Sequence, residues 1–190
     1  MRFLLLIIMF TAQPLFAKTA EAIFAGGCFW CVESDFDKLP GVVQTISGYD
    51  GGEEPNPNYD LVSSGTTKYV ESVRVLYDPT VITYSQLLNY YWHHIDPTMK
   101  NAQFCDQGHQ YRSVIFYLNE EQKNAALSSK KGLEKKFPHI VTDIISSTHF
   151  YPAEEYHQDY YKKNPLRYKY YRYRCGRDER IKELWQEKAY

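Results

Sequence analysis

Residues 20–31 read AEAIFAGGCFWC, and this stretch decides how the chain folds around its candidate site. Ala20 to Ala25 predicts a short buried strand, because its residues are almost all apolar. Gly26 and Gly27 then allow a tight strand-to-helix turn and close approach of a substrate. A helix is predicted from Cys28 to about Lys38, and Pro40-Gly41 stops it. The sequence therefore places a cysteine at the start of a helix.

The pattern predicts that Cys28 is a nucleophile. Only the thiolate is strongly reactive, and the unpaired N–H groups and positive dipole end of a helix N-terminus lower a thiol pKa. Cys31, three residues later, shares a helix face with Cys28, so the two sulfurs can approach each other. Such a C-x-x-C pair serves redox chemistry or forms half of a metal site. Phe29 and Trp30 between the cysteines predict an apolar pocket for a methyl group next to sulfur, with simple core packing as the alternative.

Length and composition indicate one globular domain. The chain has 190 residues, of which 44% are hydrophobic and 24% charged, enough for a real core. The formal net charge of -1 gives no general attraction to nucleic acid or to an anionic membrane. A basic cluster between Arg167 and Arg177 is interrupted by tyrosines, and we interpret it as a solvated, partly packed face rather than an RNA-binding patch.

The N-terminus predicts export. Arg2 precedes the apolar run Phe3 to Phe10, and Leu15-Phe16-Ala17 offers a cleavage point, as in a secretory signal peptide. We expect residues 1–17 to be the leader and residues 18–190 to be a single catalytic domain, in a periplasmic or secreted bacterial protein. The apolar run is too short to span a bilayer. A buried first strand or an uncleaved anchor is the alternative.

Strands and helices alternate along the rest of the chain. A long polar loop is expected at residues 48–64, where loops of such length are often functional. The remaining predicted strands cover residues 42–47, 70–77, 111–118 and 140–146, and the remaining helices cover residues 84–94, 120–136, 152–162 and 179–188. This order favours an α+β fold. It fits a two-layer α/β sandwich with a ferredoxin-like split β-α-β core, long loops and a C-terminal tail.

Several ordered motifs together resemble one family. They are GCFWCVE at residues 27–33, GYDGG at 48–52, NPNY at 56–59, ESVRV at 71–75, YDP at 77–79, DQGHQYRS at 106–113 and CGRD at 175–178. This set resembles the peptide methionine sulfoxide reductases of the A type, from about Ala22 to Trp185. The sequence departs from many members at Lys68-Tyr69-Val70, before the predicted acid. Ser63 stands where some members carry a recycling cysteine.

The resemblance implies a reaction and its residues. The Cys28 thiolate would attack the sulfur of a methionine sulfoxide of the S epimer, in proteins and possibly in the free amino acid. Glu71 would protonate the departing oxygen, Tyr59 and Tyr111 would polarise it, and Asp106 would orient the site. An acid beside an apolar pocket keeps its proton because burial disfavours the charged form. Phe29 and Trp30 match the family's pocket for the substrate methyl group.

The resemblance also implies a recycling step. The sulfenic acid left on Cys28 would form a disulfide with a second thiol. We predict Cys31 as this resolving thiol, because helical spacing brings it close. Cys175, on a C-terminal segment expected to be flexible beside Gly176, is the alternative, and Cys105 lies next to Asp106. No bound cofactor or metal is expected in this monomer. An external dithiol, such as a thioredoxin-like protein, would reduce the disulfide.

Two other functions compete with this hypothesis. A thioredoxin-like dithiol/disulfide oxidoreductase also uses a C-x-x-C pair, but Trp30 lies inside the pair here and the later strands do not suit that topology. A zinc-binding interaction module could use all four cysteines: Cys28, Cys31, Cys105 and Cys175. Its weakness is that only one C-x-x-C pair exists and the other two cysteines are isolated.

Overall fold

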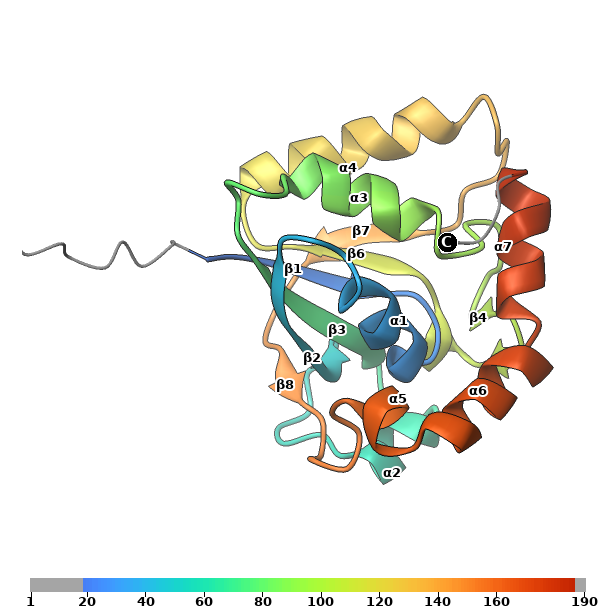
Figure 1. Cartoon of the computed structure of the whole chain (residues 1–190). Helices are drawn as coiled ribbons and strands as arrows, with labels where there is room; N and C mark the ends of the chain where they lie inside the picture. The colour runs from blue at the N-terminus through green and yellow to red at the C-terminus, as the bar shows by residue number, and fades with distance from the viewer. Residues whose placement is uncertain (1–18, 187–190) are drawn as a thin grey trace, which may run out of the picture.

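The computed structural model describes residues 19–186 of the chain. The predicted leader, residues 1–17, lies outside these described residues. A six-stranded sheet crosses the molecule in the order β7-β6-β1-β3-β2-β8 (Figure 1). Its strands are β1 (Ala20–Ala25), β2 (Val42–Asp50), β3 (Val70–Tyr77), β6 (Val114–Tyr117), β7 (Asp143–Ser146) and β8 (Tyr151–Pro152). Only β6 and β7 pair in parallel, and the other neighbours are antiparallel. The α+β class predicted from the sequence is confirmed.

Helices pack on one face of this sheet. They include α1 (Phe29–Phe36), α3 (Tyr84–Trp92) and α4 (Glu120–Leu133), and Figure 1 shows α3 and α4 running side by side. The apolar residues of β1 alternate between two faces, so Phe24 points toward the helices and Ile23 away from them. Phe24 stacks against Phe36 of α1 and Tyr91 of α3, with ring centroids 5.1 and 5.0 Å apart. These contacts fix both helices on β1.

Shorter elements surround the end of β1 where α1 begins. They are α2 (Tyr59–Ser63), a hairpin of β4 (Ala102–Gln103) and β5 (Asp106–Gln107), a 3-10 helix (His109–Tyr111) and α5 (Tyr160–Lys163). Two further helices, α6 (Pro165–Arg174) and α7 (Arg177–Trp185), complete the described chain. Within residues 19–186, no helix combines the length and the apolar character needed to cross a membrane.

The central strand β3 carries one charged side chain toward the helical layer. Val73 and Val75 of β3 belong to the core beneath the helices. Glu71 lies two residues before Val73 and therefore points to the same face. Its side chain is 2% exposed and sits at the end of the strand that faces the start of α1. The alternation of a single strand thus buries a carboxyl group beside Cys28.

Two predicted elements differ most from the structure. Residues 152–162, expected to be a helix, begin in β8 and continue as turns, and only Tyr160–Lys163 is helical. Asp159 has a left-handed φ of 52°, which interrupts any longer helix here. The predicted polar loop at 48–64 is shorter than expected, because β2 continues to Asp50 and α2 forms at its far end.

The terminal helix predicted at residues 179–188 is present as α7, but the segment around Cys175, which we expected to be flexible, is also helical. Residues 165–185 form α6 and α7, and Cys175 lies at the junction between them, where Gly176 takes a positive φ of 65°. The segment is therefore helical and packed rather than flexible. Tyr168 of α6 is buried against Cys31 of α1, whereas Tyr170 and Tyr173 on the same helix are exposed.

Candidate active site

Cys28 occupies the N-cap position of α1, directly after the turn from β1. Gly27 in that turn has a φ of +89°, and a Cβ atom there would lie 2.7 Å from the Cβ of Gln103. Only glycine therefore fits this position without moving the β4–β5 hairpin. The Cys28 side chain is 7% exposed. The sequence prediction of a cysteine on a tight strand-to-helix turn is confirmed.

The carboxyl group of Glu71 binds the residue that follows Cys28. Its Oε2 accepts a hydrogen bond from the backbone N–H of Phe29, at 3.0 Å. Burial raises the pKa of Glu71 from its ordinary value near 4.5 to about 8, and the nearby charge of Asp106 acts in the same direction. The Phe29 N–H opposes this shift without reversing it. At neutral pH, Glu71 is therefore a protonated acid.

The Cys28 thiol does not have the lowered pKa that its helix position predicts. Burial raises its pKa above the ordinary value, and the Cys31 thiol and the carboxyl groups of Glu71 and Asp106 raise it further. The largest cause is burial, because a thiolate loses the solvation that it would have in water. In the free protein, Cys28 is therefore a thiol held beside a protonated acid.

Three further predicted side chains converge on Cys28 and Glu71. Tyr59 begins α2, Tyr111 ends the 3-10 helix, and Asp106 lies in β5. Burial raises the pKa of Tyr59 to about 12, with a further contribution from Glu71. Burial also raises the pKa of Tyr111, and Glu71, Tyr59, Asp106 and Cys28 all add to this shift. Both phenols therefore keep their protons and can donate hydrogen bonds near the acid.

Asp106 connects this cluster to the C-terminal helices. Its Oδ2 accepts a hydrogen bond of 2.7 Å from the Tyr171 hydroxyl of α6, and its carboxyl group also interacts with the backbone of Cys28. Burial raises the pKa of Asp106, while Tyr171 and the charge of Arg177 lower it. Asp106 thus contacts the nucleophile's backbone on one side and α6 on the other.

The two aromatic residues of the motif have different surroundings. Phe29 is 1% exposed and Trp30 is half-buried, and their ring centroids are 6.5 Å apart. The Trp30 indole stacks on Tyr160 at 3.7 Å, and its Nε1–H donates to Nδ1 of His157 at 3.0 Å. The sequence analysis missed His157, which is 127 residues away from Trp30 and carries no local motif signal of its own.

The four cysteines form two pairs. Cys28 and Cys31 are both free, and Cys31 is 1% exposed against Tyr160 and Tyr168. The pKa of Cys31 is lowered by contact with the Cys28 thiol, and the charges of Arg177 and Arg172 lower it further. Cys105 and Cys175 are joined in a disulfide. In this state Cys175, the alternative resolving thiol, is bonded to Cys105, and the four cysteines do not form one metal-binding cluster.

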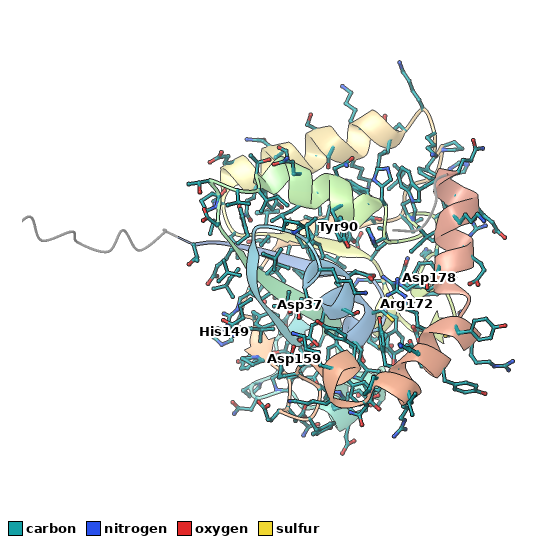
Figure 2. All side chains as sticks on the ribbon, viewed as in Figure 1. Asp37, Tyr90, His149, Asp159, Arg172 and Asp178 are labelled. Carbon is teal, nitrogen blue, oxygen red and sulfur yellow. A yellow bond between two sulfur atoms is a disulfide. The ribbon has the colours of Figure 1, made fainter. Side chains whose placement is uncertain are left out.

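In the basic segment at 167–177, Arg177 is buried and Arg172 is half-buried, although its composition predicts a mainly solvated face. Arg172 of α6 forms ion pairs with Asp35 of α1 at 2.7 Å and with Asp178 of α7 at 2.6 Å, close to α1 in Figure 2. Arg177 is 1% exposed and donates to the backbone oxygen of Gly26 at 3.1 Å. These arginines therefore tie the C-terminal helices to the turn that carries Cys28.

Comparisons with known proteins agree with this site. The family model described as peptide methionine sulfoxide reductase matches residues 20–189. A protein named peptide methionine sulfoxide reductase MsrA from Halalkalibacterium halodurans is 51% identical over 171 residues, which cover 88% of this chain and 97% of that protein. A relative named MsrA/MsrB from Vibrio cholerae is 49% identical, and the match spans 92% of this chain but only 47% of that protein.

Solved structures give the same result. The methionine sulfoxide reductase A of Corynebacterium diphtheriae is 35% identical with a TM-score of 0.76, covering 81% of this chain and 77% of that one. Mxr1 from Saccharomyces cerevisiae in its reduced form is also 35% identical, with a TM-score of 0.75 and coverage of 82% and 90%. Mxr1 has also been solved in complex with Trx2. The chain belongs to the peptide methionine sulfoxide reductase family.

Proposed function

We propose that Cys28 is the nucleophile that attacks the sulfoxide sulfur and that Glu71 is the general acid that protonates its oxygen. The observation that carries this assignment is the buried carboxyl of Glu71 on the N–H of Phe29, 3.0 Å away, beside a buried thiol. The Cys28 sulfur attacks the sulfur of a methionine sulfoxide while Glu71 donates a proton to the oxygen, and the proton of the Cys28 thiol passes to Glu71 in its place. Donation of this kind requires a carboxyl group that is neutral at working pH, and burial supplies that condition.

The hydroxyls of Tyr59 and Tyr111 assist the acid. Both remain protonated and lie in the electrostatic neighbourhood of Glu71, where they can donate to the oxygen as charge develops on it. The rings of Phe29 and Trp30 receive the methyl group of the substrate. Because this arrangement fixes the oxygen and the methyl group on different sides of the sulfur, it favours one sulfoxide epimer, which we assign as the S epimer by family.

The products are methionine and a sulfenic acid on Cys28, so the sulfoxide gains two electrons and the cysteine loses two. The Cys31 thiolate then attacks the Cys28 sulfur, water leaves, and a Cys28–Cys31 disulfide forms. Three facts support Cys31 as the resolving residue: it contacts Cys28, its pKa is lowered, and it is free while Cys175 is bonded to Cys105.

Disulfide mapping after one turnover tests this route. The protein, isolated with Cys105–Cys175 intact, receives one equivalent of a methionine S-sulfoxide peptide and is alkylated and digested. We expect a new Cys28–Cys31 bridge with the Cys105–Cys175 bridge retained. A Cys28–Cys175 bridge together with an alkylated Cys105 would overturn the assignment. A Cys31→Ser variant should still release one methionine per chain, but it should keep the sulfenic acid on Cys28.

An external protein dithiol returns the enzyme to its starting state in this proposal. The complex between Mxr1 and Trx2 supports a thioredoxin-like partner for this chain. Cys28 and Cys31 are both buried, so a bridge between them is accessible to the partner only through Cys28, the more exposed of the two. Steady-state turnover with thioredoxin, compared with turnover on glutathione alone, tests this requirement. Faster turnover with glutathione would contradict it.

We also propose that the enzyme is exported and that it works as a monomer. The pattern of residues 1–17 supports a cleaved leader and a periplasmic or secreted enzyme that repairs oxidised proteins. All the proposed catalytic groups come from one chain, which supports a monomer as the working unit. Mass spectrometry of the mature N-terminus tests the first point and size-exclusion chromatography the second. A mature protein that still begins at Met1 would contradict cleavage.

A further inference from the structure

His157 lies at the centre of the aromatic cluster that borders the proposed methyl pocket. It is 1% exposed. Its ring centroid is 4.9 Å from that of Phe29, 5.7 Å from that of Trp30 and 4.5 Å from that of Tyr59. Its Nδ1 accepts a hydrogen bond of 3.0 Å from the Nε1–H of the Trp30 indole. His157, from a turn far along the chain, therefore contacts three residues that are proposed to bind the substrate.

We propose that His157 is a positioning residue that holds the Trp30 indole in place for the methyl group of the sulfoxide. This inference rests on the proposed function, because it takes the rings of Phe29 and Trp30 as the methyl pocket. His157 does not act on the reacting atoms. It acts through Trp30, whose other face is supported by the stacked ring of Tyr160, so that the indole is held both by stacking and by one directional bond.

The bond requires a neutral imidazole. An indole N–H only donates, so Nδ1 of His157 must be unprotonated and the ring proton must lie on Nε2. Burial lowers the pKa of His157, which favours this neutral form. The titratable groups that face the ring are Tyr59 of α2 and Glu154 and Tyr156 of its own turn, while α1 contributes the uncharged rings of Phe29 and Trp30. Only Glu154 favours protonation.

The turn that carries His157 also fixes the opposite side of the site. Glu154 accepts hydrogen bonds of 2.8 Å from the backbone N–H of Tyr59 and from the Tyr49 hydroxyl. Residues 154–157 thus connect the indole of Trp30 in α1 to the backbone at the start of α2. Neither Glu154 nor His157 contacts Cys28 or Glu71 through a described hydrogen bond. Loss of the His157 bond should therefore weaken substrate binding more than the chemical step.

Two substitutions separate the bond from simple packing. His157→Asn places an amide oxygen near the position of Nδ1 and keeps an acceptor, whereas His157→Phe keeps a ring and removes the acceptor. We expect H157F to raise KM for a methionine S-sulfoxide peptide about tenfold, the order of one buried hydrogen bond, with kcat changed less than threefold. H157N should recover most of that loss. Equal losses in both folded variants, or an unchanged KM in H157F, would overturn the proposal.

A double-substitution cycle ties the effect to Trp30. In a Trp30→Phe background there is no indole donor, so H157F should add little further increase in KM. An equally large added increase would show that His157 acts independently of Trp30 and would overturn the proposal. The same cycle separates the role of His157 from the methyl pocket of the proposed function. If W30F alone leaves KM unchanged, the methyl pocket of the proposed function fails, whether or not the hydrogen bond exists.

Indole N–H resonances report the bond directly, and they decide the matter if H157F does not fold. The chain has three tryptophans, and W30F assigns the Trp30 signal by its loss. Trp92 donates to Ser129 at 3.0 Å and serves as the internal control. In the unsubstituted protein, acidification should move the Trp30 signal as His157 gains a proton, and H157N should abolish that titration. A Trp30 signal that ignores both pH and H157N would overturn the proposal.

Discussion

Oε2 of Glu71 and the backbone nitrogen of Phe29 lie 3.0 Å apart, which places a buried acid on the peptide unit that begins at Cys28. The position of this acid depends on two separate periodicities. Alternation along β3 turns Glu71 toward the helical layer, and the glycine turn after β1 brings the start of α1 over it. Acid and nucleophile are therefore held together by backbone geometry rather than by contact between their side chains.

The neutral substitution Glu71→Gln should remove the proton donor and leave the fold intact. We expect the rate of methionine formation in a single turnover to fall roughly 100- to 10,000-fold, the range of a general acid. The matched control is Glu134→Gln on the exposed end of α4, which should react at the unsubstituted rate. A Glu71→Gln enzyme within threefold of normal would contradict the assignment.

The pH dependence of the reaction should carry the signature of the same group. Because burial raises the pKa of Glu71 to about 8, the neutral form predominates below that pH and is lost above it. We therefore expect the single-turnover rate to decline as the pH rises through about 8. In Glu71→Gln this alkaline limb should vanish from the residual activity. Persistence of the same limb in that variant would assign it to another group.

Glu71→Gln should make the folded protein more stable at neutral pH, although it makes the enzyme less active. The pKa of Glu71 is about 4.5 in the unfolded chain and about 8 in the folded one. At pH 7 the side chain is therefore charged when unfolded and neutral when folded, so folding takes up a proton. Glu71→Gln should therefore raise the free energy of unfolding at pH 7 by about 3 kcal/mol. The gain should vanish at pH 4, where both states are protonated. Urea unfolding at the two pH values measures it, and an equal gain at both would contradict the linkage.

The two phenols should contribute to the rate through their hydroxyl groups alone. Tyr59→Phe and Tyr111→Phe should each slow methionine formation roughly 10- to 100-fold, below the range for loss of a principal oxyanion donor, because one phenol remains. The double variant should lose more than either single one. Tyr173→Phe, at a residue that is 73% exposed, provides the control. Unchanged rates in the double variant would remove both residues from the mechanism.

The local motifs predicted more of the site than the rest of the sequence did. Residues 20–31 predicted the strand, the glycine turn and the helix, because each step has a local chemical signal. The acid and the phenols followed from the family resemblance. The raised pKa of the Cys28 thiol did not, because it depends on burial and on the carboxyl groups of Glu71 and Asp106, which distant parts of the chain bring to Cys28.

The C-terminal part was the least predictable. The sequence of α6 is rich in tyrosine and arginine and has no apolar stripe, so its helix and its burial depend on partners elsewhere in the chain. Arg172 forms ion pairs with Asp35 and Asp178, and the Tyr171 hydroxyl donates a hydrogen bond to Asp106. The Cys105–Cys175 pairing spans 70 residues and has no spacing rule that could have revealed it. His157 escaped notice for the same reason.

The most direct test is the amount of methionine released in one turnover by Cys28→Ser, compared with Cys31→Ser. Each variant is mixed with excess methionine S-sulfoxide peptide in the absence of any reductant, and the reduced peptide is counted per chain. We predict no product from Cys28→Ser and one equivalent from Cys31→Ser, with a sulfenic acid trapped at Cys28. One equivalent from Cys28→Ser would contradict the account and would make another thiol the nucleophile.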